Sequence, residues 1–171
     1  MCAGDGRDLL GVLPDHPRRE DVAARLVELD PDLVSEARCT LQRLGLPQVE
    51  VVEGDASGTP AYIDAVPADV VLVCGVFGNI SDEDVHRTIN ELAHLVAAGA
   101  VVIWTRHRRA PDLTRTIRRW FTEAGFDEVG FDKDDRSSFG VGTNRFCGVP
   151  LEPRPGRRMF VFFGDGLAGH T

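Results

Sequence analysis

The sequence predicts an α/β fold: a doubly wound, mostly parallel sheet whose last strand runs antiparallel to its neighbours. Two observations carry this prediction. Short β-branched runs alternate with longer segments of helical periodicity, which is the pattern of βαβ units. The last two predicted strands have no clear helix between them, so we expect an antiparallel pair at one edge. Right-handed crossovers then give a three-layer α-β-α arrangement, the Rossmann-like architecture.

The strands are predicted from short apolar runs. The third of them is the densest, as expected for the buried centre of a parallel sheet. The predicted strands span residues 22–28, 49–53, 69–74, 100–104, 128–131 and 159–163. Residues 132–158 are rich in Gly, Pro and Asp, so we expect a long loop there.

The helices are predicted from their caps and their periodicity. Asp30 and Pro31 favour a helix start and Gly45 its end, so a helix is expected over 31–44. Ser81 begins a segment with apolar residues at helical spacing, which we expect to continue to Gly99. Further helical segments are predicted over 4–13, 60–65 and 111–124.

Length and composition fit one ordinary domain over residues 1–171. Hydrophobic residues make up 43% of the chain and charged residues 27%, and the net charge is -8. That charge argues against broad binding to nucleic acids or anionic membranes. We find neither an apolar run long enough to span a bilayer nor a signal peptide, so a cytoplasmic location is expected.

The cysteines and the basic residues indicate the setting of the protein. No two cysteines form a CxxC pair, which favours free thiols in a reducing compartment over a metal site. Lys133 is the only lysine, and the other basic residues are arginines. This bias suggests a GC-rich bacterial genome.

The residues that follow the predicted strands are the ones to inspect, because ligands of such sheets bind at the carboxyl ends of the strands. Gly4 and Gly6 let the backbone approach a ligand closely. Glu28 follows the next strand and is placed to accept hydrogen bonds from ribose hydroxyls. Asp55 is suited to accept from an exocyclic amine such as that of adenine, and the small Ala56 lets a ring pack flat.

A further glycine-containing segment follows the strand predicted over 69–74, which is the fourth strand end when a strand before the glycine loop is counted. Cys74 and Gly75 begin it, Phe77 is a candidate wall for an adenine or a substrate, and Asn79 closes it. Each of these signals is weak alone, because glycine turns and acidic turn residues are common. Their order at four successive strand ends is much more specific.

In this order the chain resembles class I S-adenosylmethionine (SAM)-dependent methyltransferases over nearly its whole length. The loop Cys2-Ala3-Gly4-Asp5-Gly6 resembles the glycine loop of the family, with Cys2 where a first glycine often stands. The resemblance implies SAM as cofactor and methyl transfer by in-line displacement as the reaction. It implies cofactor contacts from that loop and from Glu28, Leu29, Asp55, Ala56, Cys74 and Gly75.

The sequence departs from the family at its start. The acidic residue that precedes the glycine loop in the family would lie ahead of Met1, and most of the first strand and any N-terminal cap are absent. We therefore expect a chain that starts late, by truncation or by a misplaced start codon.

The acceptor side is less defined. Arg106 and His107 belong to a basic run that follows the strand at 100–104. One interpretation is a grip for an acidic small-molecule substrate, with His107 as a candidate base; the other is a solvated loop that pairs with the chain's own carboxylates. No motif supports methylation of nucleic-acid bases.

Two alternatives to a small-molecule methyltransferase remain open. An NAD-type oxidoreductase shares the glycines and Glu28, but Leu9 stands where its third small residue belongs, and it leaves Asp55 unexplained. A truncated or degenerate SAM-binding module without activity is the other.

Overall fold

The computed structural model describes residues 1–133 and 138–164. The chain divides into two compact units, unit 1 (residues 1–56) and unit 2 (residues 57–171), and each is described by itself. The single-domain organisation stays a prediction. Among the described residues, no helix combines the length and the apolar character that crossing a membrane requires.

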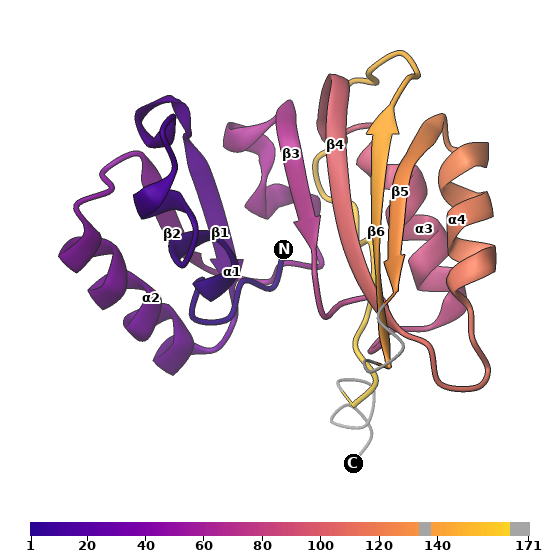
Figure 1. Ribbon diagram of the computed structural model, residues 1–171, viewed down its shortest axis with the longest axis horizontal. Coiled ribbons are helices and arrows are strands. Elements are labelled where there is room, and N and C mark those ends of the chain that lie inside the picture. Colours follow the sequence, from indigo (N-terminus) through magenta and orange to yellow (C-terminus); the bar gives the residue numbers. More distant parts are fainter. Residues whose placement is uncertain (134–137, 165–171) are drawn as a thin grey trace. The chain divides into compact units, whose positions relative to one another are not determined.

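Unit 1 is a two-stranded parallel sheet packed against helices. Strand β1 (Ala24–Glu28) pairs with β2 (Val49–Glu53), and the crossover between them is α2 (Pro31–Leu44). A short helix, α1 (Arg7–Leu10), precedes β1 and contacts α2. Figure 1 labels these four elements. Apolar side chains from all of them form the core of this unit: Leu10, Leu13, Leu26, Val34, Ala37, Leu46, Val49 and Val51.

The caps of α2 are the ones that the sequence predicts. The Asp30 side chain accepts hydrogen bonds from the backbone N–H groups of Asp32 and Leu33, which satisfies two otherwise unpaired donors. At the other end Gly45 has a φ of 63°, and its N–H donates to the carbonyl of Leu41. Both helix bounds are therefore confirmed, because local capping chemistry determines them.

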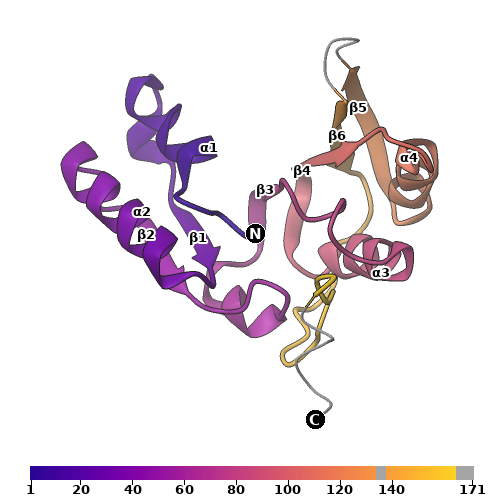
Figure 2. The same ribbon diagram turned by 90° about the horizontal axis from the view of Figure 1, so that it is seen from below.

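Unit 2 is a mixed four-stranded sheet with the order β3-β4-β6-β5. Strand β3 runs parallel to β4, whereas β6 runs antiparallel to both β4 and β5. Helices α3 and α4 contact each other, and Figure 2 shows both on the same side of this sheet. The bounds are β3 Ala68–Val73, α3 Asp82–Leu92, β4 Val96–His107, α4 Thr114–Glu123, β5 Phe126–Lys133 and β6 Phe139–Phe146.

Aromatic side chains fill the space between this sheet and its helices. Trp104 of β4 stacks on Phe121 of α4 with a centroid distance of 5.8 Å, and its indole N–H donates to the Asn144 side-chain oxygen over 2.8 Å. Gly142 of β6 lies against the indole so closely that a Cβ there would overlap it. The antiparallel strand is thus held by a tryptophan that requires glycine opposite.

The position of the last strand differs from the prediction. The sequence predicts a strand over 159–163 after a long loop over 132–158, but β6 lies inside that loop region. Residues 159–163 contribute only an isolated bridge, between Ile80 and Phe162. Gly140 and Gly142 make β6 look like a loop in the sequence, yet they are the positions where Phe131 and Trp104 need space.

The boundary between α3 and β4 also differs. The sequence predicts a helix as far as Gly99, but α3 ends at Leu92 and β4 begins at Val96. The pairing of β3 with β4 is irregular here, since Ala68 pairs with Val96 whereas Val70 pairs with Val101. Gly99, with a φ of 77°, therefore lies in a β-bulge and is not a helix cap.

Candidate functional site

The glycine loop at residues 2–6 lies beside β1 and leads into α1. The Ala3 N–H donates to the carbonyl of Val27 over 2.9 Å, and the Gly6 N–H donates to the carbonyl of Ala3 over 2.9 Å. Three residues of the loop have left-handed backbone conformations: Cys2 (φ 50°), Gly4 (φ 57°) and Gly6 (φ 76°). Cys2 is thus strained in a conformation that favours glycine, in keeping with its resemblance to a glycine position.

The two glycines of the loop have different surroundings. A Cβ on Gly6 would lie 2.9 Å from Leu26 Cδ1 and 3.0 Å from Leu10 Cδ1, so a side chain there would press on two leucines of the core. A Cβ on Gly4 would meet nothing within 4 Å. Gly4 therefore leaves room in the loop for a ligand to approach its backbone.

Glu28 holds this loop from the carboxyl end of β1. One carboxylate oxygen, Oε2, accepts from the Gly4 N–H over 2.8 Å. The other, Oε1, accepts from the N–H groups of Leu29 and Asp30 over 2.8 and 3.0 Å. A carboxylate has about four acceptor sites, so acceptor capacity remains for a ribose hydroxyl beside the open Gly4.

The Cys2 thiol lies close to two carboxylates of unit 1. Burial raises the pKa of Cys2 to about 11, and the negative charges of Glu28 and Asp55 add to the increase. The thiol is therefore protonated at neutral pH and is a poor nucleophile. The same proximity brings together residues from the glycine loop and from the ends of β1 and β2.

Asp55 and Ala56, which follow β2, differ in their exposure to solvent. Asp55 is exposed, so its carboxylate is accessible, whereas Ala56 is buried. Asp5, by contrast, binds its neighbour: the Arg7 guanidinium donates to both Asp5 oxygens over 2.7–3.0 Å and lowers the pKa of that carboxyl. Because both carboxylate oxygens of Asp5 pair with Arg7, we expect Asp5 to contact a ligand through its backbone.

In unit 2 the segment after β3 is fixed by side-chain hydrogen bonds. Gly75, with a φ of 72°, donates its N–H to the Thr105 hydroxyl of β4 over 2.9 Å. The Asn79 amide donates back to the carbonyl of Gly75 over 2.6 Å, which closes the segment on itself. Cys74 lies half-buried at its start. Sequence reasoning identified Gly75 and Asn79 but missed Thr105, because the contact crosses between strands.

Two residues that the sequence assigns to the substrate are structural. Phe77 has no exposed surface and packs against Trp104 and Phe121, so it does not wall a ligand site in unit 2. The Arg106 side chain is only 8% exposed, and its guanidinium donates to the carbonyl of Phe77. A residue two places away on a strand points to the same face, so Arg106 follows the buried Trp104 and is not free to grip a substrate.

His107 is the next residue along β4 and points to the other face of the strand. Its ring is half-buried and lies against Gly78, where a Cβ would be 3.1 Å from His107 Cδ2. The sequence named His107 but gave no indication of the contact with Gly78. Among residues 1–133 and 138–164, no three His, Cys, Asp or Glu side chains are grouped to hold a metal ion.

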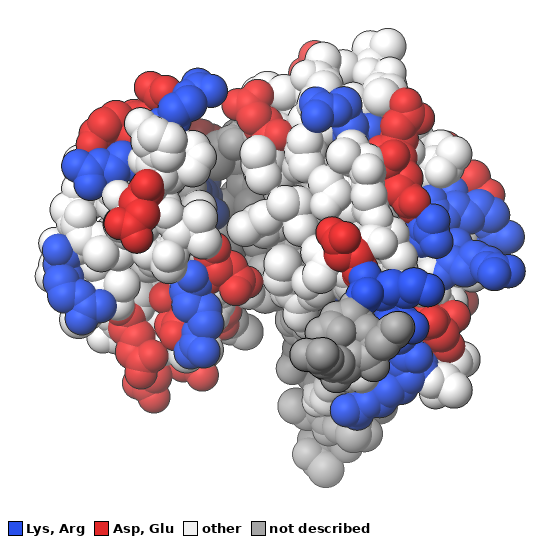
Figure 3. Space-filling model, viewed as in Figure 1, with Lys and Arg blue, Asp and Glu red and all other residues white. Residues whose placement is uncertain are grey.

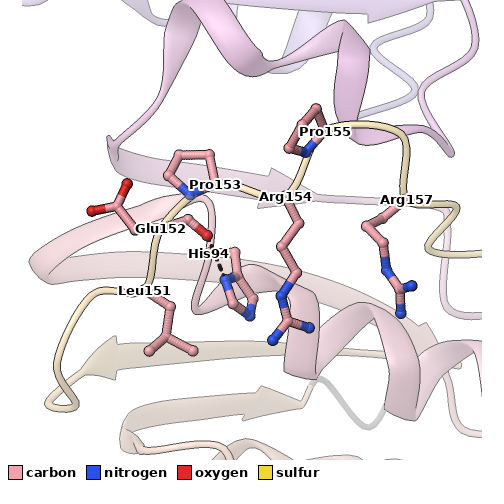
Figure 4. Close-up of a pocket in the computed structure, with 7 residues that line it drawn as sticks. All are labelled: His94, Leu151, Glu152, Pro153, Arg154, Pro155 and Arg157. Atoms are coloured by element: carbon pink, nitrogen blue, oxygen red, sulfur yellow. Dashed lines mark hydrogen bonds between the residues drawn. The ribbon is translucent and has the colours of Figure 1, made fainter.

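A pocket of unit 2 lies elsewhere, beside the segment that follows β6. Figure 4 shows Arg154 and Arg157 extending to the same side of that segment, with His94 beside them. Both arginines lie within 4 Å of the buried Glu91 carboxylate, and His94 Nδ1 hydrogen-bonds to the Glu152 carbonyl over 2.7 Å. The pocket is near the amino end of β4, opposite to His107, and its charged groups attach the segment to α3.

Arginines also gather over the part of unit 2 that carries α4 (Figure 3). Two of them are paired, since Arg118 binds Glu128 over 2.6 Å and Arg119 lies 3.4 Å from Glu123. The Arg118 guanidinium lowers the pKa of the Glu128 carboxyl. Such exposed pairs are typical of a solvated surface whose charges the chain itself partly neutralises, and they do not involve the basic run at residues 106–109.

No protein-family model matches the sequence, and no curated protein matches it significantly. Solved structures do match. An O-methyltransferase family protein from Burkholderia thailandensis superposes with a TM-score of 0.67 at 19% identity, over 85% of this chain and 49% of that one. An RNA methyltransferase from Salinibacter ruber, in complex with S-adenosyl-L-homocysteine, superposes with a TM-score of 0.58 at 18% identity, over 90% of this chain and 82% of that one. The chain has the Rossmann-like fold of class I methyltransferases.

The methyltransferase fold does not by itself determine the reaction. The [4+2]-cyclase SpnF also matches, with a TM-score of 0.63 at 14% identity, over 84% of this chain and 72% of that one. The chain spans about half the length of the Burkholderia protein. Activity, cofactor and substrate must therefore be argued from the site residues.

Proposed function

We propose that this chain is the SAM-binding body of a SAM-dependent methyltransferase that acts on a small-molecule acceptor in the cytoplasm. The observation that carries the proposal is the contact between the Glu28 carboxylate and the N–H of Gly4, in a loop whose Gly4 side is open. A carboxylate suited to accept from ribose hydroxyls lies next to a backbone with open space beside it, and this arrangement supports the proposal.

Residues of unit 1 would hold the cofactor by their backbone and their carboxylates. Gly4 provides space, Glu28 accepts from the ribose hydroxyls, and Asp55 accepts from the adenine amine beside Ala56. SAM, when bound, supplies a methyl group activated by its sulfonium, so the protein acts mainly by positioning.

An NAD-type oxidoreductase fits the described residues less well. The third glycine of the dinucleotide fingerprint allows close packing of helix on strand, but Leu9 stands there and packs against the core of unit 1. The sheet order β3-β4-β6-β5, with β6 antiparallel between two strands, also agrees with the methyltransferase fold.

Calorimetric titration of the full chain with S-adenosylhomocysteine and with NAD tests the proposal. We expect saturable binding of S-adenosylhomocysteine only. Glu28→Gln should weaken it by roughly 10-fold to 100-fold, as for a lost hydrogen bond to a charged group. The matched control is Glu36→Gln, at an exposed position on α2, which should leave affinity unchanged. Binding of NAD instead, or of neither compound, would overturn the proposal.

A further inference from the structure

A turn in the segment that follows β6 carries two arginines, and a buried threonine fixes its backbone. Thr59 has no exposed surface; its hydroxyl donates to the Arg154 carbonyl over 2.6 Å and accepts from the Arg157 N–H over 3.0 Å. The Thr59 N–H donates in turn to the Arg157 carbonyl over 2.9 Å. Three hydrogen bonds therefore hold the turn to unit 2 without the arginine side chains, which stay available for another purpose.

The two guanidinium groups retain most of their hydrogen-bonding capacity. Arg154 Nη1 and Arg157 Nε lie 3.5 and 3.7 Å from the same Glu91 oxygen, Oε1. Both distances are longer than an ordinary N–H···O hydrogen bond. Within residues 1–133 and 138–164, neither arginine side chain donates a hydrogen bond to another group. Each guanidinium has five N–H donors, so a ligand can use several of them at once.

Glu91 explains why the two arginines converge. Its side chain is 7% exposed, and its second oxygen, Oε2, is buried without a hydrogen-bond partner in the described part of the chain. A buried carboxylate is costly unless positive charge lies close to it, so Glu91 draws both guanidinium groups to one place. Two cations beside one anion leave an excess of positive charge, which an anionic ligand would neutralise.

These arginines line the pocket of unit 2 together with His94 (Figure 4). His94 is only 7% exposed, and its Nδ1–H donates to the Glu152 carbonyl, which leaves Nε2 as the ring nitrogen for a ligand. Leu151 is 47% exposed and extends to the same side of the segment as the arginines. With a volume of about 590 Å³, the pocket has room for a small organic molecule.

We propose that this pocket binds an organic phosphate monoester. A guanidinium fork binds two phosphate oxygens at once, so Arg154 and Arg157 together can hold a phosphate from two directions. His94 Nε2 would accept from a P–OH group or, as imidazolium, donate to a phosphate oxygen. A carboxylate, with two oxygens in one plane, offers less to three converging side chains. Leu151 would contact the organic body of the ester.

This site is separate from the contacts proposed for the cofactor. Its side chains come from α3, from the connection between α3 and β4, and from the segment after β6. All of these belong to unit 2, whereas Gly4, Glu28 and Asp55 belong to unit 1. The phosphate site is therefore an inference that does not depend on the proposed function.

Calorimetric titration of the full chain with phenyl phosphate, inorganic phosphate and benzoate at constant ionic strength tests the site. We expect phenyl phosphate to bind saturably, about tenfold more tightly than benzoate and several-fold more tightly than inorganic phosphate. Arg154→Gln and Arg157→Gln should each weaken phenyl phosphate binding by roughly tenfold or more, as for a lost charge-assisted hydrogen bond. Arg119→Gln, on the exposed surface of α4, is the matched control and should leave this affinity unchanged.

Two further measurements avoid any loss of folding in the arginine variants. Leu151→Ala alters a half-exposed side chain and should weaken phenyl phosphate several-fold while leaving inorganic phosphate unchanged. Phenylglyoxal, which modifies accessible arginines, should label Arg154 and Arg157 of the wild-type chain more slowly when phenyl phosphate is bound. Arg119 should keep its labelling rate. Mass spectrometry of the peptides measures the rates, and circular dichroism establishes that each variant is folded.

The possible outcomes are distinct. No saturable binding of phenyl phosphate, or an affinity that survives both arginine substitutions in folded protein, would refute the site. Equal affinity for phenyl phosphate and inorganic phosphate would identify free phosphate as the ligand and overturn the assignment to an organic ester. Benzoate binding as tightly as phenyl phosphate would overturn the assignment to phosphate. Because S-adenosylhomocysteine binding is measured separately, failure of either proposal leaves the other standing.

Discussion

At the scale of single residues, the glycine loop shows that neighbouring glycines can have different purposes. Gly6 is packed between Leu10 and Leu26, whereas Gly4 faces open space. Both have left-handed φ values, so the sequence pattern alone treats them as equals. Only their surroundings separate a residue that stabilises unit 1 from one that leaves room for a ligand.

Alanine at these two positions should therefore affect different properties, stability at Gly6 and ligand affinity at Gly4. Gly6→Ala combines backbone strain with a clash against two leucines, and we expect it to lower the free energy of unfolding by roughly 2–4 kcal/mol. Gly4→Ala should cost only about 1 kcal/mol of strain, but should reduce S-adenosylhomocysteine affinity tenfold or more. Urea denaturation and calorimetry measure the two effects; equal losses of stability would contradict the distinction.

Cys2 allows a prediction about thiol reactivity. Its pKa is raised to about 11, mainly by burial, so the folded protein keeps the thiol protonated where an ordinary cysteine ionises. At pH 8 we expect iodoacetamide to modify the exposed Cys39 well before Cys2. Mass spectrometry of the peptides measures both rates.

The same pKa gives a direction for stability. The pKa of Cys2 is higher in the folded protein than in the unfolded chain. The contribution of Cys2 to the free energy of unfolding is therefore fully present below pH 9 and is lost as the pH rises through about 11. In denaturant the difference in labelling between Cys2 and Cys39 should disappear. Equal labelling in the folded protein would show that Cys2 is not protected.

At the scale of elements, helix α2 illustrates what local sequence determines. Its start depends on a single side chain, since Asp30 accepts from two backbone N–H groups of the first turn. Its end depends on Gly45 in a left-handed conformation. The Asp30 cap spans three residues and the Gly45 hydrogen bond to Leu41 spans four. Both ends of the helix can therefore be predicted from the local sequence.

Removal of this cap should be measurable. Asp30→Ala is expected to lower the stability of unit 1 by about 1 kcal/mol, because two amide groups lose their acceptor. Asp32→Ala changes the charge of the first turn without removing the cap, and should cost clearly less. Urea denaturation followed by circular dichroism compares the two, and a larger loss for Asp32→Ala would contradict the assignment.

Strand β6 illustrates the opposite case. Its glycines lower the strand propensity of residues 139–146, so the sequence predicts a loop. In the sheet they face Phe131 and Trp104, which supply the missing volume from other strands. The reason for the glycines lies far away in the sequence, and no local pattern contains it.

At the scale of the whole molecule, the two units differ in how much structure supports them. Unit 1 has two strands and a small apolar core, whereas unit 2 has four strands and an aromatic core. A two-stranded sheet depends strongly on the helices that pack against it. The proposed cofactor contacts of Gly4, Glu28 and Asp55 all belong to this smaller unit.

We therefore expect hydrogen exchange to be faster in unit 1 than in unit 2. Amides of β1 and β2 should lose protection before those of β4 and β6, because opening them exposes less apolar surface. S-adenosylhomocysteine should then slow exchange in residues 2–6 and in β1, since a ligand stabilises the state that binds it. Mass spectrometry with and without the compound measures this, and an effect restricted to unit 2 would contradict the proposed cofactor residues.

The sequence by itself determined the fold class, the alternation of strands and helices, and the order of Gly4, Glu28 and Asp55, of which the last two lie at the ends of successive strands. These features arise from periodicity, caps and turn residues, which act over a few neighbouring positions. The tertiary structure alone decided that β6 is the antiparallel strand, that Phe77 and Arg106 are buried, and that His107 lies against Gly78. Those outcomes depend on contacts between distant segments, because whether a side chain fills a core or faces a ligand is set by what packs against it.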